Sequence, residues 1–392
     1  MKLAVLGAGN GGQAMAAYLS IKGCQINLYN RTPESLIPIK KKGGIDLNGV
    51  YNGFGKLNLV TSNIKKAITG VEFILVITPA VAHSYFADQL SPYLEDGQKI
   101  ILNPGRTGGA LEFKNILTKN NCNADVIVAE TQTFLFASRV TGSAEATIFG
   151  EKNRVTIAAF PSNRTRELDD LLEVLPKFSP VENVLKTSLD NIGAIFHPCP
   201  TLLNIGWIES TEGKFNYYQQ GISDSVSMIM EKMDQERMKV ARALGVDPIS
   251  ACDWMRLSYG IEGNNLYELL QNNYQYQGIK APCAVNHRYL FEDVPMSLVP
   301  ISSIADKFGI KTPTINLIIE LAGTVLNTNF WKKGRTVKSL GISKLSKREI
   351  LRLVNKGKLD NVRVLPGIKR NIYKKLDNVI YNKFPEYQKE VE

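Results

Sequence analysis

A short stretch near the N-terminus most constrains what this chain can fold into. Residues 3–6 have the pattern of a buried strand and residues 11–22 that of a helix, and the connection between them contains GAGNGG. This fits G-x-G-x-x-G, whose glycines permit a tight turn, close approach of a pyrophosphate, and close packing of helix on strand. The N-terminus of the helix then faces the phosphates. We therefore predict a dinucleotide site formed by Gly7, Gly9, Asn10, Gly11 and Gly12.

The end of the second predicted strand bears on the choice of cofactor. The segment CQINLYN ends at Asn30 and is followed by Arg31 and Thr32, with no Asp or Glu to accept hydrogen bonds from a ribose 2′-OH. The guanidinium of Arg31 matches the 2′-phosphate of NADP. We therefore predict that NADP(H) is favoured, with NAD(H) as the alternative if Arg31 is a solvated loop residue.

Further strands and helices alternate up to about residue 132. The segments 71–80, 98–105 and 125–132 are apolar strands, and residues 83–97 and 110–120 have the pattern of helices between them. Continuous apolar strands separated by helices predict a parallel sheet covered on both faces, which is an α/β Rossmann domain with a doubly wound, mostly parallel sheet.

Ligands of such sheets collect at the carboxyl ends of the strands. Thr78 and Pro79, the loop 103–109 and the pair Glu130–Thr131 are expected there. Arg106 lies in this glycine-rich loop, where it could clamp a substrate carboxylate or a cofactor phosphate, or simply be a surface arginine after a turn.

The second half of the chain has a different pattern. After a β-rich stretch around 145–160, residues 165–178 and 223–245 repeat apolar residues at helical spacing, with Gly245 as a natural stop. With 392 residues, two domains are the default expectation. We predict a Rossmann domain over 1–186, a mostly α-helical substrate domain over 187–356 and a basic extension over 357–392.

Charge and cysteine content narrow the classes of partner. Residues 331–392 hold 17 of the 47 Lys and Arg and 6 of the 37 Asp and Glu, which leaves 30 basic and 31 acidic residues in the rest of the chain. The basic tail predicts an amphipathic extension with a solvated face, and contact with nucleic acid is the less favoured alternative. Five widely spaced cysteines without a C-x-x-C pair argue against disulfides and zinc. We expect a cytoplasmic protein with no export signal and no membrane span.

His197 is one of only three histidines, and Pro198 and Pro200 follow it directly before an apolar run. A packing histidine or a proton-transfer residue would both fit this position. Asp293 precedes Val294-Pro295, a pair expected to break a helix, so we expect this carboxylate at an irregular edge. A dinucleotide fold followed by a helical domain with one His and one Asp predicts a dehydrogenase with its substrate between the domains.

Seven segments, in this order and spacing, extend the comparison from residue 1 to about residue 356. They are GAGNGGQAMAAYL, LNPGRTGGALEF, VAETQTFLFASR, NIGAIFHPCPTLLNIGWIE, MEKMDQERMKVARALG, HRYLFEDVPMSLVPISSIADKFGIKTP and GRTVKSLGISKLSKREI. Together they resemble the opine dehydrogenase family of the octopine/nopaline type.

The resemblance implies an NAD(P)H-dependent reductive condensation of an L-amino acid with a 2-oxo acid, usually pyruvate, to a secondary amine dicarboxylate. His197 and Asp293 match the catalytic pair of the family, and Arg288 matches the arginine that contacts the oxo-acid carboxylate. Glu130 and Thr131 match a pair near the substrate. Asn204 is assigned to the substrate site as well, Arg106 departs from the neutral amide expected in octopine-type relatives, and a homodimer without a metal is expected.

The chemistry of these residues fits the implied roles. Histidine has an ordinary pKa of about 6.5, so it can exchange protons near neutral pH, and a carboxylate behind the ring fixes its tautomer. Two other classes remain as alternatives. One comprises the glycerol-3-phosphate dehydrogenases and ketopantoate reductases, which rely on a catalytic lysine, and the other is a non-enzymatic NADP-binding regulator with a basic tail.

Overall fold

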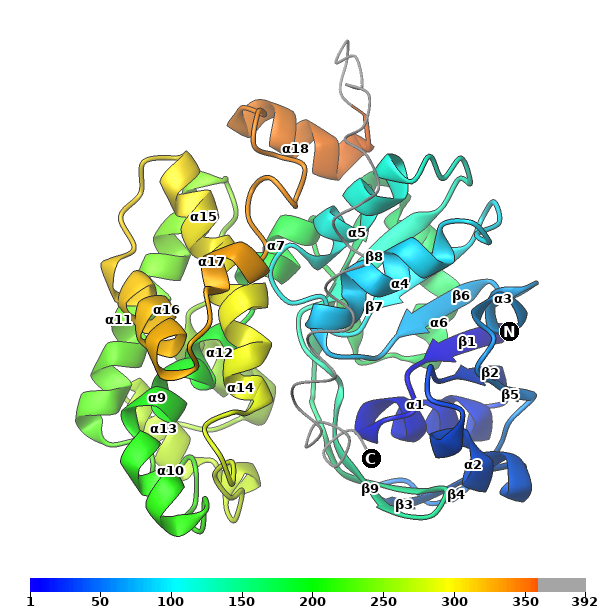
Figure 1. Cartoon of the computed structure of the whole chain (residues 1–392), viewed down its shortest axis with the longest axis horizontal. Coiled ribbons are helices and arrows are strands. Elements are labelled where there is room, and N and C mark those ends of the chain that lie inside the picture. The colour runs from blue at the N-terminus through cyan, green and yellow to red at the C-terminus, as the bar shows by residue number, and fades with distance from the viewer. Residues whose placement is uncertain (359–392) are drawn as a thin grey trace.

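The structure, a computed structural model, describes residues 1–358. Figure 1 shows an α/β half, coloured blue to cyan, beside a helical half, coloured green to orange. The α/β half is built on one large sheet of eight strands. These are β1 (Lys2–Leu6), β2 (Gln25–Tyr29), β5 (Leu59–Thr61), β6 (Phe73–Val76), β7 (Lys99–Leu102), β8 (Ile127–Thr131), β11 (Val155–Phe160) and β12 (Phe178–Pro180).

The strand order, β12-β11-β8-β7-β6-β1-β2-β5, is that of a doubly wound sheet. The strands from β5 to β8 are parallel, and β11 joins β8 in antiparallel orientation with Ile157 opposite Thr131. The predicted α/β class with a mostly parallel sheet is thus confirmed. Residues alternate between two apolar layers: Leu3 and Val5 of β1 enter one cluster, and Ala4 and Leu6 enter the other.

Helices cover both faces because the strands are apolar on both sides. The helix α1 (Asn10–Ile21) packs on the Leu3 face, whereas α4 (His83–Leu90) and α5 (Gly109–Lys119) pack on the Ala4 face. Two shorter helices, α2 (Ile37–Lys42) and α3 (Ile64–Ile68), complete the first part of this half.

A second, four-stranded sheet lies against α1 and was not foreseen. It comprises β3 (Gly44–Gly49), β4 (Gly53–Lys56), β9 (Phe136–Gly142) and β10 (Glu145–Glu151), in the order β4-β3-β10-β9. Gly55 of β4 lies so close to α1 that a Cβ would come within 2.5 Å of the Cα of Ala17. The sequence indicated β structure only for the part that contains β10 and β11.

The helical half begins after β12. Its elements are α7 (Val184–Leu189), α8 (Gly193–Phe196), α9 (Pro198–Leu203), α10 (Ile205–Thr211), α11 (Asp224–Ala243), α12 (Ala251–Tyr259), α13 (Leu266–Asn272), α14 (Arg288–Phe291), the π-helix η5 (Val294–Leu298), α15 (Val299–Lys307), α16 (Pro313–Val325), α17 (Phe330–Lys333) and α18 (Lys347–Lys356). The helix expected over 223–245 is confirmed as α11. Ser223 caps its start by accepting from the amide of Val226, and Gly245 follows it in a left-handed conformation.

Two predicted helices are wrong in extent. The helix expected over 83–97 ends as α4 at Leu90, because Pro92 comes two residues later and disfavours helical continuation. The helix expected over 165–178 is a 3-10 segment, η3 (Ser162–Leu168), followed by the short α6 (Asp169–Val174). Pro176 ends this segment, and the chain continues into β12.

One apolar cluster runs without a break from the Ala4 face of the sheet into the helical half. It includes Leu102 of β7 and Phe113 of α5 as well as Met230 of α11, and it also takes in Leu340 and Ile342 beyond α17. The chain therefore returns from the helical half to the α/β half, where α18 packs against η3 and β11 (Figure 1).

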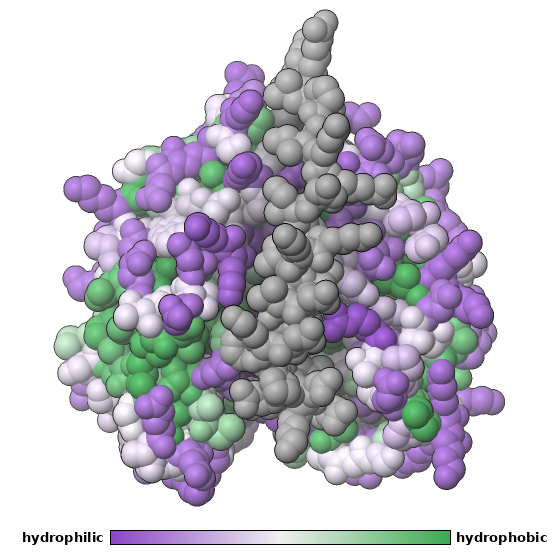
Figure 2. All heavy atoms as spheres, in the orientation of Figure 1, coloured by the Kyte–Doolittle hydropathy of each residue, from purple (hydrophilic) through white to green (hydrophobic). Residues whose placement is uncertain are grey.

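The surface differs between the halves. Figure 2 shows hydrophobic residues gathered on one side of the helical half. Among the residues described, no helix combines the length and the apolar character needed to cross a bilayer. The predicted basic extension, 357–392, lies outside the described residues except for Gly357 and Lys358.

Candidate active site

The glycine-rich turn after β1 has the geometry that a dinucleotide requires. Gly7 has a φ of 111°, and a Cβ there would come within 2.5 Å of the carbonyl oxygen of Ile77. A Cβ on Gly12 would overlap the carbonyl oxygen of Gly7. Gly9 precedes α1 without a side-chain cap, so the first amides of the helix remain for a phosphate. Asn10 and Gly11 open the helix, and the Asn10 side chain accepts a hydrogen bond from the amide of Val140 (2.8 Å).

The end of β2 lies beside this turn. Asn30 accepts a hydrogen bond from the amide of Ala8 (3.2 Å) and donates to the hydroxyl of Ser35 (2.6 Å). It therefore links the glycine-rich turn to the segment that follows β2. Arg31 is exposed, and its guanidinium lies 5.5 Å from the centre of the Tyr85 ring. Asn30, predicted to bind the cofactor, therefore contacts the glycine-rich turn, and Arg31, predicted to select the cofactor, is the next residue.

Thr78 and Pro79 follow β6 after one intervening residue, and Thr78 borders the same turn. The methyl group of Thr78 lies against Gly7, where a Cβ on the glycine would approach it to 2.8 Å. The hydroxyl of Thr78 is buried without a hydrogen-bond partner among the residues described. A buried hydroxyl of this kind is suited to a bound ligand.

His197 and Asp293 form a hydrogen-bonded pair. The Nδ1 atom of His197 lies 2.8 Å from Oδ2 of Asp293, which leaves Nε2 as the ring nitrogen for proton exchange with a substrate. The His197 side chain is 17% exposed and the Asp293 side chain is fully buried. The Tyr289 ring stacks on the imidazole with 4.1 Å between ring centres and 7° between planes.

The backbone at His197 is fixed from several sides. The residue joins α8 to α9, and Pro198 and Pro200 occupy the start of α9, where a missing amide hydrogen costs nothing. The carbonyl of His197 accepts hydrogen bonds from the hydroxyls of Thr201 and Tyr217, both at 2.8 Å. The prolines thus direct the chain at the point where the imidazole meets Asp293.

The expected position of Asp293 at an irregular edge is wrong. The residue is fully buried, and the chain after it stays helical, as the π-helix η5, instead of breaking at Val294-Pro295. The wider turn accommodates the proline, and the amide of Met296 still donates to the carbonyl of Glu292 (2.9 Å).

Arg106 is buried at the same place and is fully engaged in ion pairs. Its Nη1 lies 3.1 Å from Oδ1 of Asp293, and its Nε lies 3.2 Å from Oε1 of Glu292. Burial alone would lower the pKa of Arg106, but Asp293 and Glu292 raise it above its ordinary value. Burial alone would raise the pKa of Glu292, but Arg106, Arg288 and the amide of Ala80 hold it well below its usual range. Arg106 and Glu292 are therefore both ionised near neutral pH.

Arg288 begins α14 and has about half of its side chain exposed (51%), with Nη2 3.3 Å from Oε2 of Glu292. Through Glu292 it is joined to Arg106 and Asp293. The structure thus brings four of the predicted site residues into one connected cluster: His197, Asp293, Arg106 and Arg288.

Glu130, Thr131 and Asn204 have other partners. The Glu130 carboxylate is fully buried and accepts hydrogen bonds from the amide of Ala110 and the hydroxyls of Thr187 and Ser188. Burial raises its pKa, while these hydrogen bonds oppose the rise. Thr131 donates to Asn103 (2.9 Å), and Asn204 donates to the carbonyls of Pro200 and Gly221. These contacts join β8 to α5 and α7, and α9 to the loop before α11.

Three residues of this region were not singled out by the sequence analysis. Glu292 and Tyr289 lie in the segment quoted for the family resemblance, but only the fold shows that they contact Arg106 and His197. Lys152 lies between β10 and β11, and its ammonium donates to the carbonyl of Phe134 (2.9 Å). Burial, with a smaller contribution from Arg106, lowers the pKa of Lys152 to about 8.

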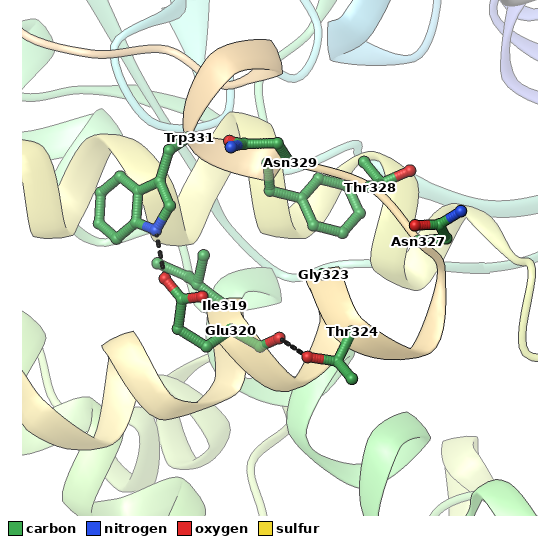
Figure 3. Close-up of a pocket in the computed structure, with 9 residues that line it drawn as sticks. Ile319, Glu320, Gly323, Thr324, Asn327, Thr328, Asn329 and Trp331 are labelled. Atoms are coloured by element: carbon green, nitrogen blue, oxygen red, sulfur yellow. Dashed lines mark hydrogen bonds between the residues drawn. The ribbon is translucent and has the colours of Figure 1, made fainter.

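A pocket of about 460 Å³ lies elsewhere, between the end of α16 and α17 (Figure 3). Its lining includes Glu320, which accepts a hydrogen bond from the indole of Trp331 (2.7 Å), and it contains none of the residues of the His197 cluster. The candidate active site is therefore the His197 cluster between the two halves, and not this pocket.

Comparison with known proteins agrees with this architecture. Residues 180–326 match the family model described as "NAD/NADP octopine/nopaline dehydrogenase, alpha-helical domain", and residues 2–104 match "NAD-dependent glycerol-3-phosphate dehydrogenase N-terminus". The opine dehydrogenase of Arthrobacter sp. (strain 1C) is 39% identical over 345 residues, which span 88% of this chain and 96% of that protein. The chain belongs to the opine dehydrogenase family.

Membership in the opine dehydrogenase family makes this protein an NAD(P)-dependent oxidoreductase that acts on CH–NH donors. Octopine dehydrogenase of Pecten maximus is a more distant relative, 22% identical over 359 residues that span 81% of this chain and 88% of that protein. The predicted family and enzyme class are thus confirmed.

Solved structures of opine dehydrogenases share the fold. Octopine dehydrogenase with NADH and L-arginine matches with a TM-score of 0.76 and 19% identity, over 93% of this chain and 100% of that chain. Yersinopine dehydrogenase with NADP⁺ bound matches with a TM-score of 0.68 and 16% identity, over 88% and 98% of the two chains. At these identities the likeness concerns the fold alone.

Proposed function

We propose that this protein condenses an L-amino acid with a 2-oxo acid, of which pyruvate is the first candidate, and that His197 and Asp293 carry the proton transfers. The observation that carries the proposal is the 2.8 Å contact between Nδ1 of a partly exposed imidazole and a fully buried carboxylate. A buried anion orients such a ring and stabilises its protonated form. The octopine dehydrogenase structures, one with L-arginine and one with pyruvate, support the substrate class.

The proposed chemistry follows from these positions. The unprotonated amino group attacks the carbonyl carbon, while protonated His197 donates a proton to the carbonyl oxygen and then takes one from the amine nitrogen. His197 passes this second proton to the new hydroxyl group, which leaves as water and gives the protonated imine. The glycine turn would hold the dinucleotide, which would supply the hydride that reduces the imine carbon. Asp293 holds the imidazole and compensates its positive charge whenever the ring is protonated. General acid–base catalysis of this kind contributes about 10²- to 10⁴-fold to a rate.

Arg288 is the residue we assign to the oxo-acid carboxylate. Its side chain is half exposed, and its ion pair with Glu292, at 3.3 Å, keeps the guanidinium beside the His197 cluster. A guanidinium binds a carboxylate through two parallel hydrogen bonds, which orients the carbonyl as well as attracting the charge.

For the cofactor we propose a preference for NADP(H). Arg31 follows β2 at the mouth of the glycine turn, where Asn30-Arg31-Thr32 provides no acidic side chain. Replacing Arg31 by Asp should lower the ratio of kcat/KM for NADPH over NADH by at least about tenfold, because a cation is exchanged for an acceptor of the 2′-OH. Steady-state kinetics with both cofactors measure this ratio, and Lys22→Asp, a charge change on the far end of α1, is the control. An unchanged ratio would contradict the assignment of Arg31.

The first experiment is an NADPH- and NADH-oxidation assay with pyruvate and a panel of L-amino acids. Oxidation should require both substrates. His197→Ala and Asp293→Asn should each lower kcat by about 10²-fold or more, while NADPH fluorescence shows that both variants still bind the cofactor. Oxidation with the oxo acid alone would instead establish a simple reductase. The homodimer expected from the sequence stays a prediction, for which sedimentation is the measurement.

A further inference from the structure

Arg106 reaches from the cofactor-binding half into the catalytic cluster. It lies in the loop between β7 and α5, with a φ of 57°, a left-handed conformation that is unusual for a residue other than glycine. The loop is held in place by Arg335, which donates to the carbonyls of Gly105 (2.9 Å) and Thr107 (3.2 Å). The amide of Thr107 in turn donates to the carbonyl of Met296 in η5 (3.1 Å). The strained residue is thus fixed from both halves, which is typical of a functional position.

The carboxylate of Asp293 is shared between two partners. Its Oδ2 faces Nδ1 of His197 at 2.8 Å, and its Oδ1 faces Nη1 of Arg106 at 3.1 Å. The other edge of the guanidinium is paired with Glu292. With 6% of its side chain exposed and both edges occupied, Arg106 is not placed as an open anchor for a substrate.

The helical half leaves room for this guanidinium. Gly193, at the start of α8 and four residues before His197, lies so close that a Cβ would collide with Nη1 of Arg106. The glycine therefore permits the arginine to approach the carboxylate that faces His197.

We propose that Arg106 is a positioning residue that fixes the Asp293 carboxylate against His197 and tunes proton transfer from the cofactor-binding half. This inference rests on the proposed function of the His197–Asp293 pair. The guanidinium fixes one carboxylate oxygen, so the other points at the imidazole. It also places a positive charge beside the pair, which opposes a second positive charge on His197.

The charged and titratable groups around the pair come from several elements. Arg106 approaches from the β7–α5 loop, Glu292, Tyr289 and Arg288 from α14 and its end, and His287 from the residue before α14. When Arg106 is removed, the buried carboxylates of Asp293 and Glu292 lose the cation that they share. Of Asp293, Glu292 and His197, the histidine then takes up a proton most readily, because its ordinary pKa is the highest. Protonation of His197 should therefore persist to higher pH.

The test compares Arg106→Gln and Arg106→Lys in the oxidation of the opine, where His197 must accept a proton and activity rises with pH. In Arg106→Gln the pH of half-maximal kcat/KM should rise by about one unit, with kcat lowered by about tenfold or more. Arg106→Lys keeps the charge and should keep the wild-type midpoint. Gly193→Ala displaces the guanidinium and should move the midpoint in the same direction as Arg106→Gln.

Arg237 provides the matched control. It is also fully buried and ion-paired to two carboxylates, Asp190 and Asp234, within the helical half. Arg237→Gln and Arg237→Lys should lower stability and leave the pH midpoint unchanged. An equal midpoint in wild type and Arg106→Gln, or equal shifts in the Gln variants at 106 and 237, would overturn the proposal.

A measurement without turnover separates this proposal from the proposed function. The chain has three histidines, so the ring signals of ¹⁵N-histidine-labelled protein can be followed by NMR against pH. The signal lost in His197→Ala should titrate at higher pH in Arg106→Gln than in wild type or Arg237→Gln. If no amino acid supports NADPH oxidation, the proposed function fails, but an upward titration shift in Arg106→Gln still supports the role of Arg106. If the His197 signal titrates at the same pH in Arg106→Gln and in wild type, the proposed role of Arg106 is wrong, whatever the NADPH-oxidation assay shows.

Discussion

Among single residues, Tyr289 restrains His197 by stacking of the two rings and not by an ionic contact. Its ring lies parallel to the imidazole with 4.1 Å between ring centres, and it also contacts the Tyr217 ring with 5.3 Å between centres. A stacked aromatic surface limits rotation of the imidazole about its bond to Cβ and shields one face from water. The hydrogen bond to Asp293 then fixes the remaining direction of the ring.

Replacing Tyr289 by Leu should therefore lower kcat for the condensation about 3- to 10-fold, which corresponds to the energy of one aromatic contact. Tyr289→Phe keeps the stacked ring and should retain nearly wild-type kcat. Steady-state kinetics of the two variants at one pH make the comparison. Equal losses in both variants would show that the hydroxyl, and not the stacking, matters at this position.

Residues of the site could be predicted from the sequence only where the residue type or the family resemblance indicates a catalytic or binding role. His197 stands out because histidine is rare in this chain, and the family resemblance adds Asp293 and Arg288. Glu292 and Tyr289 could not be assigned from the sequence, because their roles depend on contacts with Arg106 and His197 across long stretches of chain. Glu130 was predicted near the substrate from the same resemblance, but its hydrogen bonds lead to Thr187 and Ser188.

At the scale of elements, the helix α4 begins with a buried histidine. His83 starts α4 and is fully buried, and its Nδ1 accepts a hydrogen bond from Arg335 (2.9 Å). Burial and the nearby guanidinium hold its pKa well below the ordinary value. The folded protein thus keeps this ring neutral, whereas the unfolded chain binds a proton there below about pH 6.5.

The sign of the pH effect follows from this difference. Above about pH 6.5 neither state is protonated and His83 has no effect, but below it the unfolded state is favoured by up to about 1.4 kcal/mol per pH unit. His83→Asn keeps an acceptor near the Nδ1 position without a titrating group. Urea unfolding between pH 7.5 and 5.5 should therefore show a flatter loss of stability in His83→Asn than in wild type. Parallel curves would contradict the burial of a neutral ring.

Elements were predictable where the chain has a strong local pattern. The strands β6, β7 and β8 are continuous apolar runs, and α11 has both an apolar period and end signals at Ser223 and Gly245. The small sheet was not predictable, because β3 and β4 contain four glycines in ten residues and β3 pairs with β10, about a hundred residues later. The π-helix after Asp293 was misread as a break, because a proline such as Pro295 normally ends an α-helix.

For the molecule as a whole, Arg335 links the end of the helical half to the α/β half. It is buried and donates to the carbonyls of Gly105, Thr107 and Ala80, to His83 and to the carboxylate of Glu112. These partners lie in two separate segments of the α/β half, residues 80–83 and 105–112. The arginine thus stabilises the loop that carries Arg106 and the start of α4 together.

Arg335→Met should lower the free energy of unfolding by about 3 kcal/mol or more, because it leaves a carboxylate and several carbonyls without their donor. Lys338→Met removes the same charge from an exposed position three residues later and should change the unfolding midpoint little. Chemical denaturation of both variants measures the difference. Equal unfolding midpoints in the two variants would show that water replaces the Arg335 guanidinium without loss of stability.

The return of the chain to the α/β half restricts how the two halves can move. The backbone crosses between the halves twice, where β12 leads into α7 and where the segment with Arg335 and Leu340 leads to α18 (Figure 1). A rigid body that is tethered at one point can rotate in any direction, but one tethered at two points can rotate only about the line through them. The two crossings of the backbone thereby limit a rotation of one half against the other to a hinge with a single axis.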